Sequence, residues 1–379
     1  MAAAFALMAG LGWWWVRGPA MARGVVAAPP EIDIDPPGMR ARREAAQALA
    51  TMPDDPWTFA ESLAASAPDK GAERDKEDCG LADAPQFTRT DSTDEEPSLT
   101  HAAAPRYLAT QARMDAALRA SGDPFERVVA DFVNAADLRN WDGSDAAVVQ
   151  QAAVSNDPRV VSLGHAVCSR MSGLPACAAL GAGRWALVDA GNGMPWIEIL
   201  AQAQASGDAA GVQEAMSHLA GATRFDLYFF AVPGAVARRM PEDPRDLAAG
   251  SDLVTRAMGR AAALTFPTFK ALLDVCRDRA GGDEQRAHQC VEISDTMYAH
   301  SDTLLSFALS GALLQHATGD ASRRESIRAE RAIFAAHWSP ATGLSKCGTL
   351  RDTVQKLARN AEIGEVAAMR EDARKFVTP

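Results

Sequence analysis

The residues of this sequence that are best suited to covalent or metal chemistry are its 6 cysteines: Cys79, Cys168, Cys177, Cys276, Cys290 and Cys347. A cysteine can form a disulfide, bind a metal as the thiolate, or attack a substrate as a nucleophile. An even number of cysteines behind a candidate N-terminal export signal favours disulfides, and six cysteines can pair in 15 ways. The spacing of the cysteines narrows this choice.

Two pairs of cysteines would close short loops. Cys168 and Cys177 flank the turn-forming sequence SGLP, and Cys276 and Cys290 flank a Gly-Gly pair between two predicted helices. In the chain-entropy model each such disulfide contributes about 3 kcal/mol to stability. Elimination then leaves the first cysteine of the chain to pair with the last, which would clasp the N-terminal segment onto the C-terminal region.

The rival interpretation of one of these pairs is a metal site. Cys276, His288 and Cys290 offer three of the four ligands of a tetrahedral site, but no fourth ligand is evident and no CxxC occurs in the chain. A third interpretation is a nucleophilic cysteine activated by a histidine base, and the sequence singles out no such pair. Disulfides are the favoured interpretation, and we expect no metal and no cofactor.

Other motifs that would indicate catalysis are missing from the sequence. It contains no G-x-x-x-x-G-K phosphate loop, no G-x-S-x-G elbow, no S-x-x-K and no H-E-x-x-H. Three of the 7 histidines, His165, His218 and His316, fall on predicted helices, where a hydrogen-bonded or solvated histidine is expected. Interleaved glutamates make a solvated charged face the better interpretation of one basic stripe: Arg324, Arg328 and Arg331. We therefore predict no catalytic residue.

The elements that would position these side chains are helices, and the clearest pair lies between residues 192 and 220. The first helix has apolar residues at i, i+3, i+4 and i+7: Trp196, Ile199, Leu200 and Ala203. Asn192 is a candidate N-cap, Pro195 suits the first turn, and Gly207 ends the helix. Asp208 then caps a second helix with the same spacing: Val212, Ala215, Met216 and Leu219. So short a turn predicts antiparallel helices.

This hairpin resembles a tetratricopeptide-type repeat. The resemblance rests on Trp196 early in the first helix, on Leu200-Ala201, on the Gly207-Asp208 turn and on Ala215 in the second helix. It covers about one repeat, and it departs from the family pattern because Gln204 stands where an aromatic residue is usual and no proline closes the unit. The resemblance implies a partner-binding scaffold and carries no catalytic residue.

Other helix boundaries extend the helical prediction along the chain. Asp123-Pro124 is a helix start at which Glu126 is placed to close a capping box, and Asp157 caps another helix start 34 residues later. A Gly-Asp junction separates helical stretches four times, at residues 122–123, 207–208, 282–283 and 319–320. Hydrophobic residues make up 47% of the chain but aromatic residues only 6%, so much of the apolar share is alanine, a strong helix former.

These features predict an all-α domain over residues 106–379, built of stacked antiparallel helical hairpins in a tetratricopeptide-like α-solenoid and stapled by disulfides. Residues 27–105 contain Pro-Pro pairs and acidic clusters, so we expect a largely disordered tether with short helices. Residues 1–26 form a signal peptide or an N-terminal membrane anchor.

The N-terminal prediction rests on an uncharged apolar run over residues 2–16. The run is shorter than the roughly 20 residues that cross a bilayer, and Ala20-Met21-Ala22 fits a signal-peptidase site. An uncleaved anchor to the inner membrane, with Trp13 to Trp15 at the headgroup level, is a second interpretation. A third is the apolar first helix of a cytosolic protein with free thiols. Export to the periplasm or the medium is favoured, as for an exported protein of bacterial type.

Charge narrows the possible partners. The formal net charge is −11, so a nucleic-acid duplex is not an expected partner, because phosphate contacts need clustered Lys and Arg. The sequence predicts a non-catalytic periplasmic scaffold or adaptor that binds a protein or peptide between its hairpins. The alternative is an enzyme, such as a hydrolase acting on envelope polymers, whose site consists of dispersed residues. Two carboxylates with opposed pKa shifts in one pocket would favour that alternative.

Overall fold

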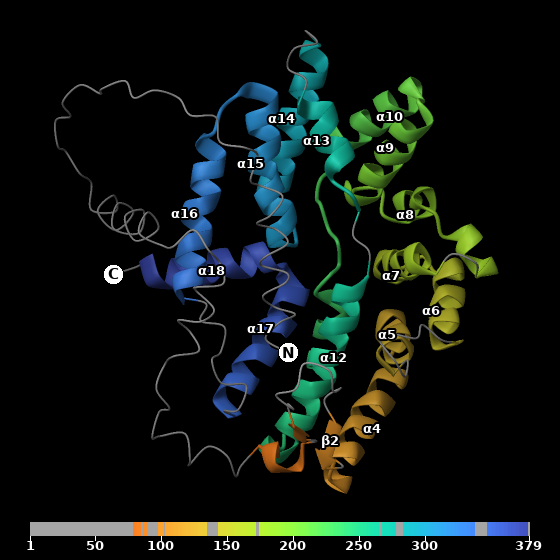
Figure 1. Ribbon diagram of the computed structural model, residues 1–379, viewed down its shortest axis with the longest axis vertical. Helices are drawn as coiled ribbons and strands as arrows, with labels where there is room; N and C mark the ends of the chain where they lie inside the picture. The colour runs from red at the N-terminus through yellow and green to blue at the C-terminus, as the bar shows by residue number, and fades with distance from the viewer. Residues whose placement is uncertain are drawn as a thin grey trace, which may run out of the picture. The chain divides into compact units, whose positions relative to one another are not determined.

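The computed structural model describes residues 79–84, 86–88, 98–101, 103–134, 143–171, 174–264, 267–277, 283–337 and 347–377, which are predominantly helical (Figure 1). The all-α prediction is confirmed. The expectations for residues 1–26, and for residues 27–78 of the tether, lie outside the described residues. Within the described residues, no helix has the length and apolar character needed to cross a membrane.

The chain divides into two compact units, and the one described below comprises residues 68–324 and 343–379. Its first helices pack in a row in which each contacts the next. They are α4 (Pro105–Arg119), α5 (Pro124–Asn134), α6 (Gly143–Val154), α7 (Pro158–Arg170), α8 (Ala182–Val188), α9 (Met194–Ser206) and α10 (Ala209–Ala220). A short 3-10 helix, η2 (Pro175–Ala179), separates α7 from α8.

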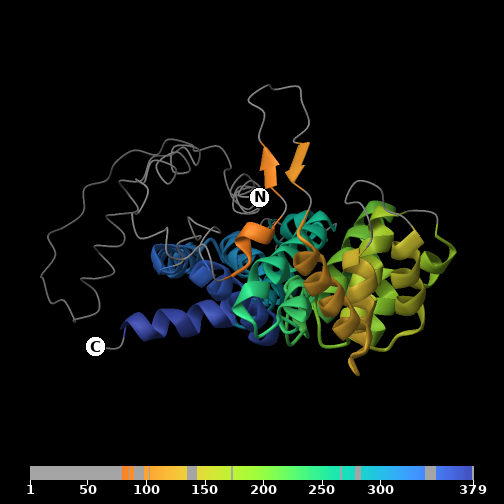
Figure 2. The ribbon, with the colours of Figure 1, turned by 90° about the horizontal axis from the view of Figure 1, so that it is seen from below.

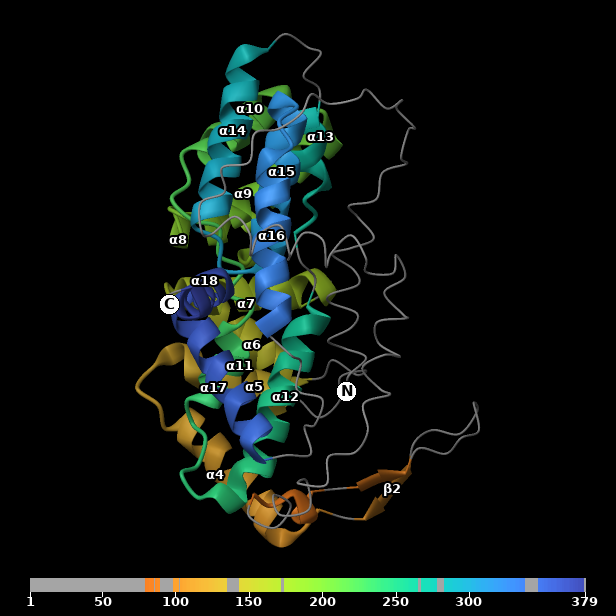
Figure 3. The same ribbon diagram turned by 90° about the vertical axis from the view of Figure 1, so that its left-hand side faces the viewer.

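The later helices pack back onto this row instead of extending it. They are α11 (Ala231–Ala237), η3 (Pro244–Asp246), α12 (Leu247–Ala263), α13 (Lys270–Arg277), α14 (Glu284–Ala299), α15 (Leu304–Thr318), α17 (Cys347–Ile363) and α18 (Glu365–Val377). α11 and α12 contact α5 and α17, whereas α13 contacts α9 and α14 contacts α10 (Figures 1 and 3). α16 (Ser322–His337) begins in this unit and continues into the other.

The segment before α4 contains elements that the sequence did not predict. A 3-10 turn, η1 (Leu81–Asp83), is followed by an antiparallel pair of short strands, β1 (Gln86–Thr88) and β2 (Ser98–His101). The two strands stand away from the helices of the unit (Figure 2). Their few residues leave the helical character of the fold unchanged.

Several helix ends follow the capping chemistry of the sequence. The Asp157 carboxylate accepts a hydrogen bond from the Arg159 backbone N–H at 2.9 Å, and Asp208 accepts one from Gly211 at 2.9 Å. Gly207, between α9 and α10, has a φ of 71°, a left-handed conformation that glycine adopts without a Cβ clash. The hairpin of α9 and α10 therefore has the turn that was predicted.

Three local expectations are wrong in detail. The N-cap of α9 is Gly193 and not Asn192, although the Asn192 Oδ1 still accepts from the backbone N–H of Met194 at 3.0 Å. The buried face of α9 is centred on Ile197 instead of the half-buried Trp196. Glu126 closes no capping box, because its carboxylate accepts hydrogen bonds from two arginines of the chain that follows α11.

Three disulfides join the described cysteines: Cys79–Cys347, Cys168–Cys177 and Cys276–Cys290. These are the three pairs that loop length and elimination favoured. The first joins residues 268 positions apart and lies in a small apolar cluster with Leu247, Ala248 and Leu350. Disulfides persist in proteins that fold in an oxidising compartment, so the structure points to an extracytoplasmic location.

Candidate binding cleft

A cleft of about 320 Å³ opens where α7, α8 and α9 meet the segment that precedes α11 and the C-terminal end of α12. Most of its lining is apolar, and includes Phe125, Leu163, Trp185, Leu227, Phe229, Val232 and Leu264. Phe125 and Trp185 are almost wholly buried, so the cleft wall is the edge of the hydrophobic core. A concave apolar surface with a few polar groups is the usual form of a binding site.

Two ionisable side chains, His165 of α7 and Glu198 of α9, form one wall of the cleft. The His165 Nε2 lies 2.7 Å from the Glu198 Oε2, and its Nδ1 lies 2.7 Å from the Leu180 carbonyl oxygen. A carbonyl oxygen only accepts hydrogen bonds, so Nδ1 must carry a proton. The hydrogen bonds thus join α7 both to α9 and to the chain that leads into α8.

The protonation of this pair follows from its two neighbours. Burial opposes a charge on His165, but the hydrogen bond and the charge of Glu198 outweigh burial and raise the pKa of His165 above 6.5. Burial likewise favours a neutral Glu198, but His165, with a smaller contribution from Gln202, lowers the pKa of that carboxyl below 4.5. When His165 is protonated, the pair is an imidazolium bonded to a carboxylate, and both ring nitrogens donate.

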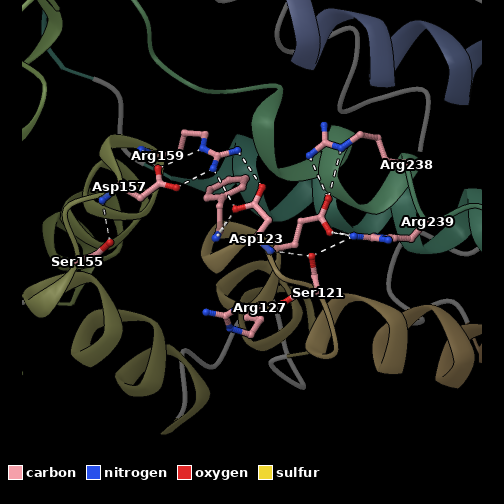
Figure 4. A network of polar contacts seen from close by, with 10 residues as sticks. Ser121, Asp123, Arg127, Ser155, Asp157, Arg159, Arg238 and Arg239 are labelled. Atoms are coloured by element: carbon pink, nitrogen blue, oxygen red, sulfur yellow. Dashed lines mark hydrogen bonds and ion pairs between the residues drawn. The ribbon is translucent and has the colours of Figure 1, made fainter.

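Arg159 also lines the cleft and is held by two carboxylates (Figure 4). Its Nη2 lies 2.6 Å from Asp157 Oδ2 and 3.0 Å from Asp123 Oδ1, and its guanidinium lies 4.8 Å from the centre of the Phe125 ring. Both carboxylates also cap helices, α7 and α5, which fixes their position. The arginine is thus a rigid part of the wall, with its charge more than balanced.

Another wall of the cleft is formed by Leu227, Tyr228 and Phe229. They belong to the segment 224–230, which lies between two other parts of the chain. The backbone N–H of Gly193 donates to the Arg224 carbonyl at 2.9 Å, and the N–H of Phe225 donates to the His300 carbonyl at 2.9 Å. A Cβ on Gly193 would lie 2.2 Å from the Phe225 ring, so this approach requires glycine. This segment connects α10 to α11, and its Leu227 and Phe229 are buried in the hydrophobic core.

Tyr228 gives this wall its unusual backbone. Among the described residues, Tyr228 is the one non-glycine residue with a positive φ, which is 56°. Such a conformation costs about 1–3 kcal/mol for a bulky side chain. The Asp302 carboxylate accepts hydrogen bonds from the backbone N–H groups of Leu227 at 3.0 Å and Tyr228 at 2.8 Å. The Tyr228 hydroxyl donates to Asp189 at 2.9 Å, and burial raises the pKa of that hydroxyl. These bonds hold the strained residue at the cleft.

A buried polar network lies behind this wall. The Asp189 carboxylate, 1% exposed, accepts from the Asn192 amide at 2.8 Å and from the Arg224 guanidinium. Arg224 also bonds Asp226 at 2.9 Å. Burial raises the pKa of Asp226 to about 6, and burial with the charge of Asp226 raises the pKa of Asp302 to about 8. The network positions the cleft, but neither Asp226 nor Asp302 lines it.

The other sequence candidates lie outside the cleft. Cys276 and Cys290 are joined to each other, and His288 is 72% exposed and bonded to Glu292 at 3.3 Å, so the proposed metal ligands do not converge. His218 is exposed and stacks on Trp196 with 3.7 Å between ring centres. Burial lowers the pKa of His316, and Arg324 of the basic stripe donates to Gln315. Of the three helical histidines, only His165 reaches the cleft.

Sequence analysis missed most of the polar residues of this site. Glu198 was hidden among many acidic residues, and Tyr228 stood in an aromatic run that predicts core. Arg159 gave one signal, because it follows the Asp157 cap and can reach back to it. The partners of Glu198 and Tyr228 are 33 and 74 residues away, and no local pattern links such positions.

No protein-family model matches the chain, and no curated protein or solved structure shows significant similarity to it. The resemblance of α9 and α10 to a tetratricopeptide-type repeat therefore stays a prediction. The arguments for function rest on the cleft.

Proposed function

We propose that this protein is a non-catalytic helical scaffold or adaptor whose cleft binds a side chain of a protein or peptide partner. The observation that supports the proposal is the cleft itself, an apolar hollow at the edge of the core with a fixed polar rim. Its volume of about 320 Å³ lies at the lower end of the roughly 300–1,000 Å³ of ligand pockets, which is room for one large side chain of a partner. Fixed walls favour binding, because few side chains lose conformational entropy when a partner binds.

The polar groups of the cleft support binding over catalysis. Both nitrogens of His165 are engaged, so neither serves as a base for the serines Ser162 and Ser169 that line the cleft. A hydrolase with a carboxylic acid and a carboxylate base needs two carboxyl groups with opposed pKa values. Among the described lining residues, one carries a carboxyl group, Glu198. The required pair of carboxyl groups is therefore not found in the described lining, and the enzyme hypothesis gains no support from it.

We further propose that the protein acts in the periplasm or outside the cell. The three disulfides support this location, and residues 2–16 would supply the export signal or an inner-membrane anchor. Mass spectrometry of the protein from its native cells tests this. We expect the mass of a chain without free thiols, and six free thiols on an intact N-terminus would refute the location.

Site-specific photo-crosslinking in the native cell tests partner binding. Ser169 is exposed at the cleft rim, and its hydroxyl donates to the His165 carbonyl four residues earlier. Ser206 is a matched control, because it is also exposed, also donates to a carbonyl four residues earlier, and lies outside the cleft lining. A photoreactive amino acid at position 169 should give a discrete protein adduct, and one at position 206 should not.

A cleft-filling variant completes this test. Ala166 lines the cleft and is half-buried, so Ala166→Leu should fill the hollow and abolish the adduct formed from position 169. Ala205→Leu, at an exposed site on α9, is the control and should leave the adduct unchanged. A folded, disulfide-bonded protein that gives no adduct at position 169, or one that Ala166→Leu does not affect, would refute partner binding at this cleft.

A further inference from the structure

The charges around the cleft indicate which kind of partner it binds. This inference rests on the proposed function, the binding of a partner side chain in the cleft. Three charged side chains line it: Arg159, His165 and Glu198. Asp123 and Asp157 both bond Arg159, so two carboxylates surround one guanidinium. His165 and Glu198 form a pair of opposite charge. Taken with its direct partners, the lining therefore carries a negative charge when His165 is protonated, and a larger one when it is neutral.

The second layer of charge has the same sign. Asp189 lies behind Tyr228 and shares Arg224 with Asp226, so two carboxyl groups there bond one guanidinium. On the side of α13, Lys270 and Arg277 both pair with Asp274, which offsets part of their positive charge. The whole chain has a net charge of −11. A carboxylate or phosphate near the cleft would thus meet repulsion, and a cation would meet attraction.

Glu198 offers the contact point for such a cation. Its Oε2 bonds His165, whereas its Oε1 accepts one long hydrogen bond of 3.3 Å, from Gln202 on the same helix. The side chain is 27% exposed, so Oε1 can be reached from solvent. A carboxylate oxygen has room for a second donor, and an ammonium or guanidinium supplies one.

We propose that the partner of the cleft is a peptide segment in which an apolar side chain is flanked by Lys or Arg. The apolar side chain fills the hollow between Trp185 and Phe229, and the flanking cation bonds the Glu198 Oε1. Arg159 takes no part in recognition of an anion, because Asp123 and Asp157 occupy its guanidinium. The cleft thus selects its partner by sign of charge as well as by shape.

The test uses the full chain and three labelled seven-residue peptides that share a central Phe. Its two neighbours on each side are Lys in the first peptide, Ser in the second and Glu in the third, and fluorescence anisotropy gives each Kd. A half-exposed ion pair is worth about 0.2–1 kcal/mol, so the Lys peptide should bind about 1.4- to 5-fold more tightly than the Ser peptide, and the Glu peptide more weakly than both. The preference should shrink at 0.5 M salt, because exposed charges are screened.

Two variants locate the preference. Glu198→Gln should remove the difference in affinity between the Lys peptide and the Ser peptide, whatever its effect on the affinity of both. Glu214→Gln is the matched control, since Glu214 is an exposed glutamate on the neighbouring helix α10. A loss of affinity that is equal for all three peptides in Glu198→Gln would mean that Glu198 only supports the wall, and would overturn the proposal.

The outcomes separate this inference from the proposed function. If the Ser peptide binds, Ala166→Leu abolishes binding, and charge has no effect, then the cleft binds peptides and the selection by charge is wrong. Tighter binding of the Glu peptide would likewise overturn the selection. If none of the three peptides binds to a folded, oxidised chain at millimolar concentration, both the inference and the proposed cleft function fail.

Discussion

A buried ion pair between α6 and α12 gives the strongest prediction for stability. The Arg260 Nη2 bonds the Asp145 Oδ1 at 2.7 Å, and the two side chains are 2% and 0% exposed. The guanidinium also lies 4.7 Å from the centre of the Phe132 ring of α5. The next residue, Ala261, lines the cleft, so this pair fixes the helix that forms part of the cleft wall. The variant Asp145→Asn keeps the shape and removes the negative charge.

The expected cost follows from the burial of Arg260. An arginine cannot lose its proton, so Asp145→Asn removes a carboxylate that balances the Arg260 charge in the core. Breaking a buried pair in this way costs about 3–5 kcal/mol, a large part of the roughly 5–15 kcal/mol that stabilises a typical domain. With an unfolding entropy of roughly 0.5–0.6 kcal/mol per kelvin for a fold of this size, the melting temperature should fall by about 5–9 °C.

Urea unfolding followed by circular dichroism measures this cost, and two further variants test its cause. Asp274→Asn breaks the exposed Lys270–Asp274 pair, whose side chains are 63% and 30% exposed, and should cost less than about 1 kcal/mol. The double variant Asp145→Leu and Arg260→Met removes both charges and should recover most of the lost stability. The reasoning is refuted if the double variant is as unstable as Asp145→Asn, or if Asp145→Asn costs no more than Asp274→Asn.

Three shorter predictions concern the cleft wall, a helix contact and the long-range disulfide. The pKa of His165 is raised and that of Glu198 is lowered, so the pair contributes fully to the stability of the fold between about pH 4.5 and 6.5, and this contribution is lost as the pH rises through the folded pKa of His165. NMR titration of the His165 imidazole in the wild type and in Glu198→Gln tests this. An unchanged pKa in the variant would contradict it. A Cβ on Gly234 would lie 2.0 Å from the nearest atom of α17, so Gly234→Ala should destabilise the fold by about 1–3 kcal/mol. A Cβ on Gly259 meets nothing within 4 Å, so Gly259→Ala should stabilise the fold by about 0.5–1 kcal/mol. Thermal melts that rank the two variants the other way would refute this. Cys79→Ser opens the disulfide that spans 268 residues and should lower stability by about 3–5 kcal/mol in urea, and an unchanged midpoint would show that this link does not constrain the unfolded chain.

The features that the sequence predicted are those with short-range causes. The α9–α10 hairpin depends on a glycine that takes a left-handed turn and on an aspartate that caps the next helix, and both signals lie within a few residues of their effect. The face of α9 was wrong by one residue, because Trp196 and Ile197 are both apolar and only the neighbouring helices decide which of them is buried. Periodicity therefore gave the helix correctly but not its rotation.

The capping box predicted for Glu126 failed for a similar reason. A glutamate three residues after a cap can reach back to it, but a buried carboxylate gains more from charged donors. In the structure Glu126 lies 2.8 Å from the Nε of Arg239 and 3.3 Å from the Nη2 of Arg238, and the cap itself bonds Ser121 (Figure 4). Those arginines lie more than 110 residues away, so the competition was invisible in the local sequence.

The cleft depends both on short-range sequence features and on contacts between residues far apart in the sequence. The Cys168–Cys177 disulfide closes a loop short enough to be predicted, and it holds the end of α7 beside the chain that carries the Leu180 carbonyl. That carbonyl fixes the ring of His165, and the fixed ring then meets Glu198 from another helix. A short-range covalent link thus restricts one partner of a long-range ion pair. If the wall depends on this chain of contacts, selective opening of the disulfide should lower the pKa of His165 toward 6.5, and an unchanged pKa would show that helix packing alone orients the pair.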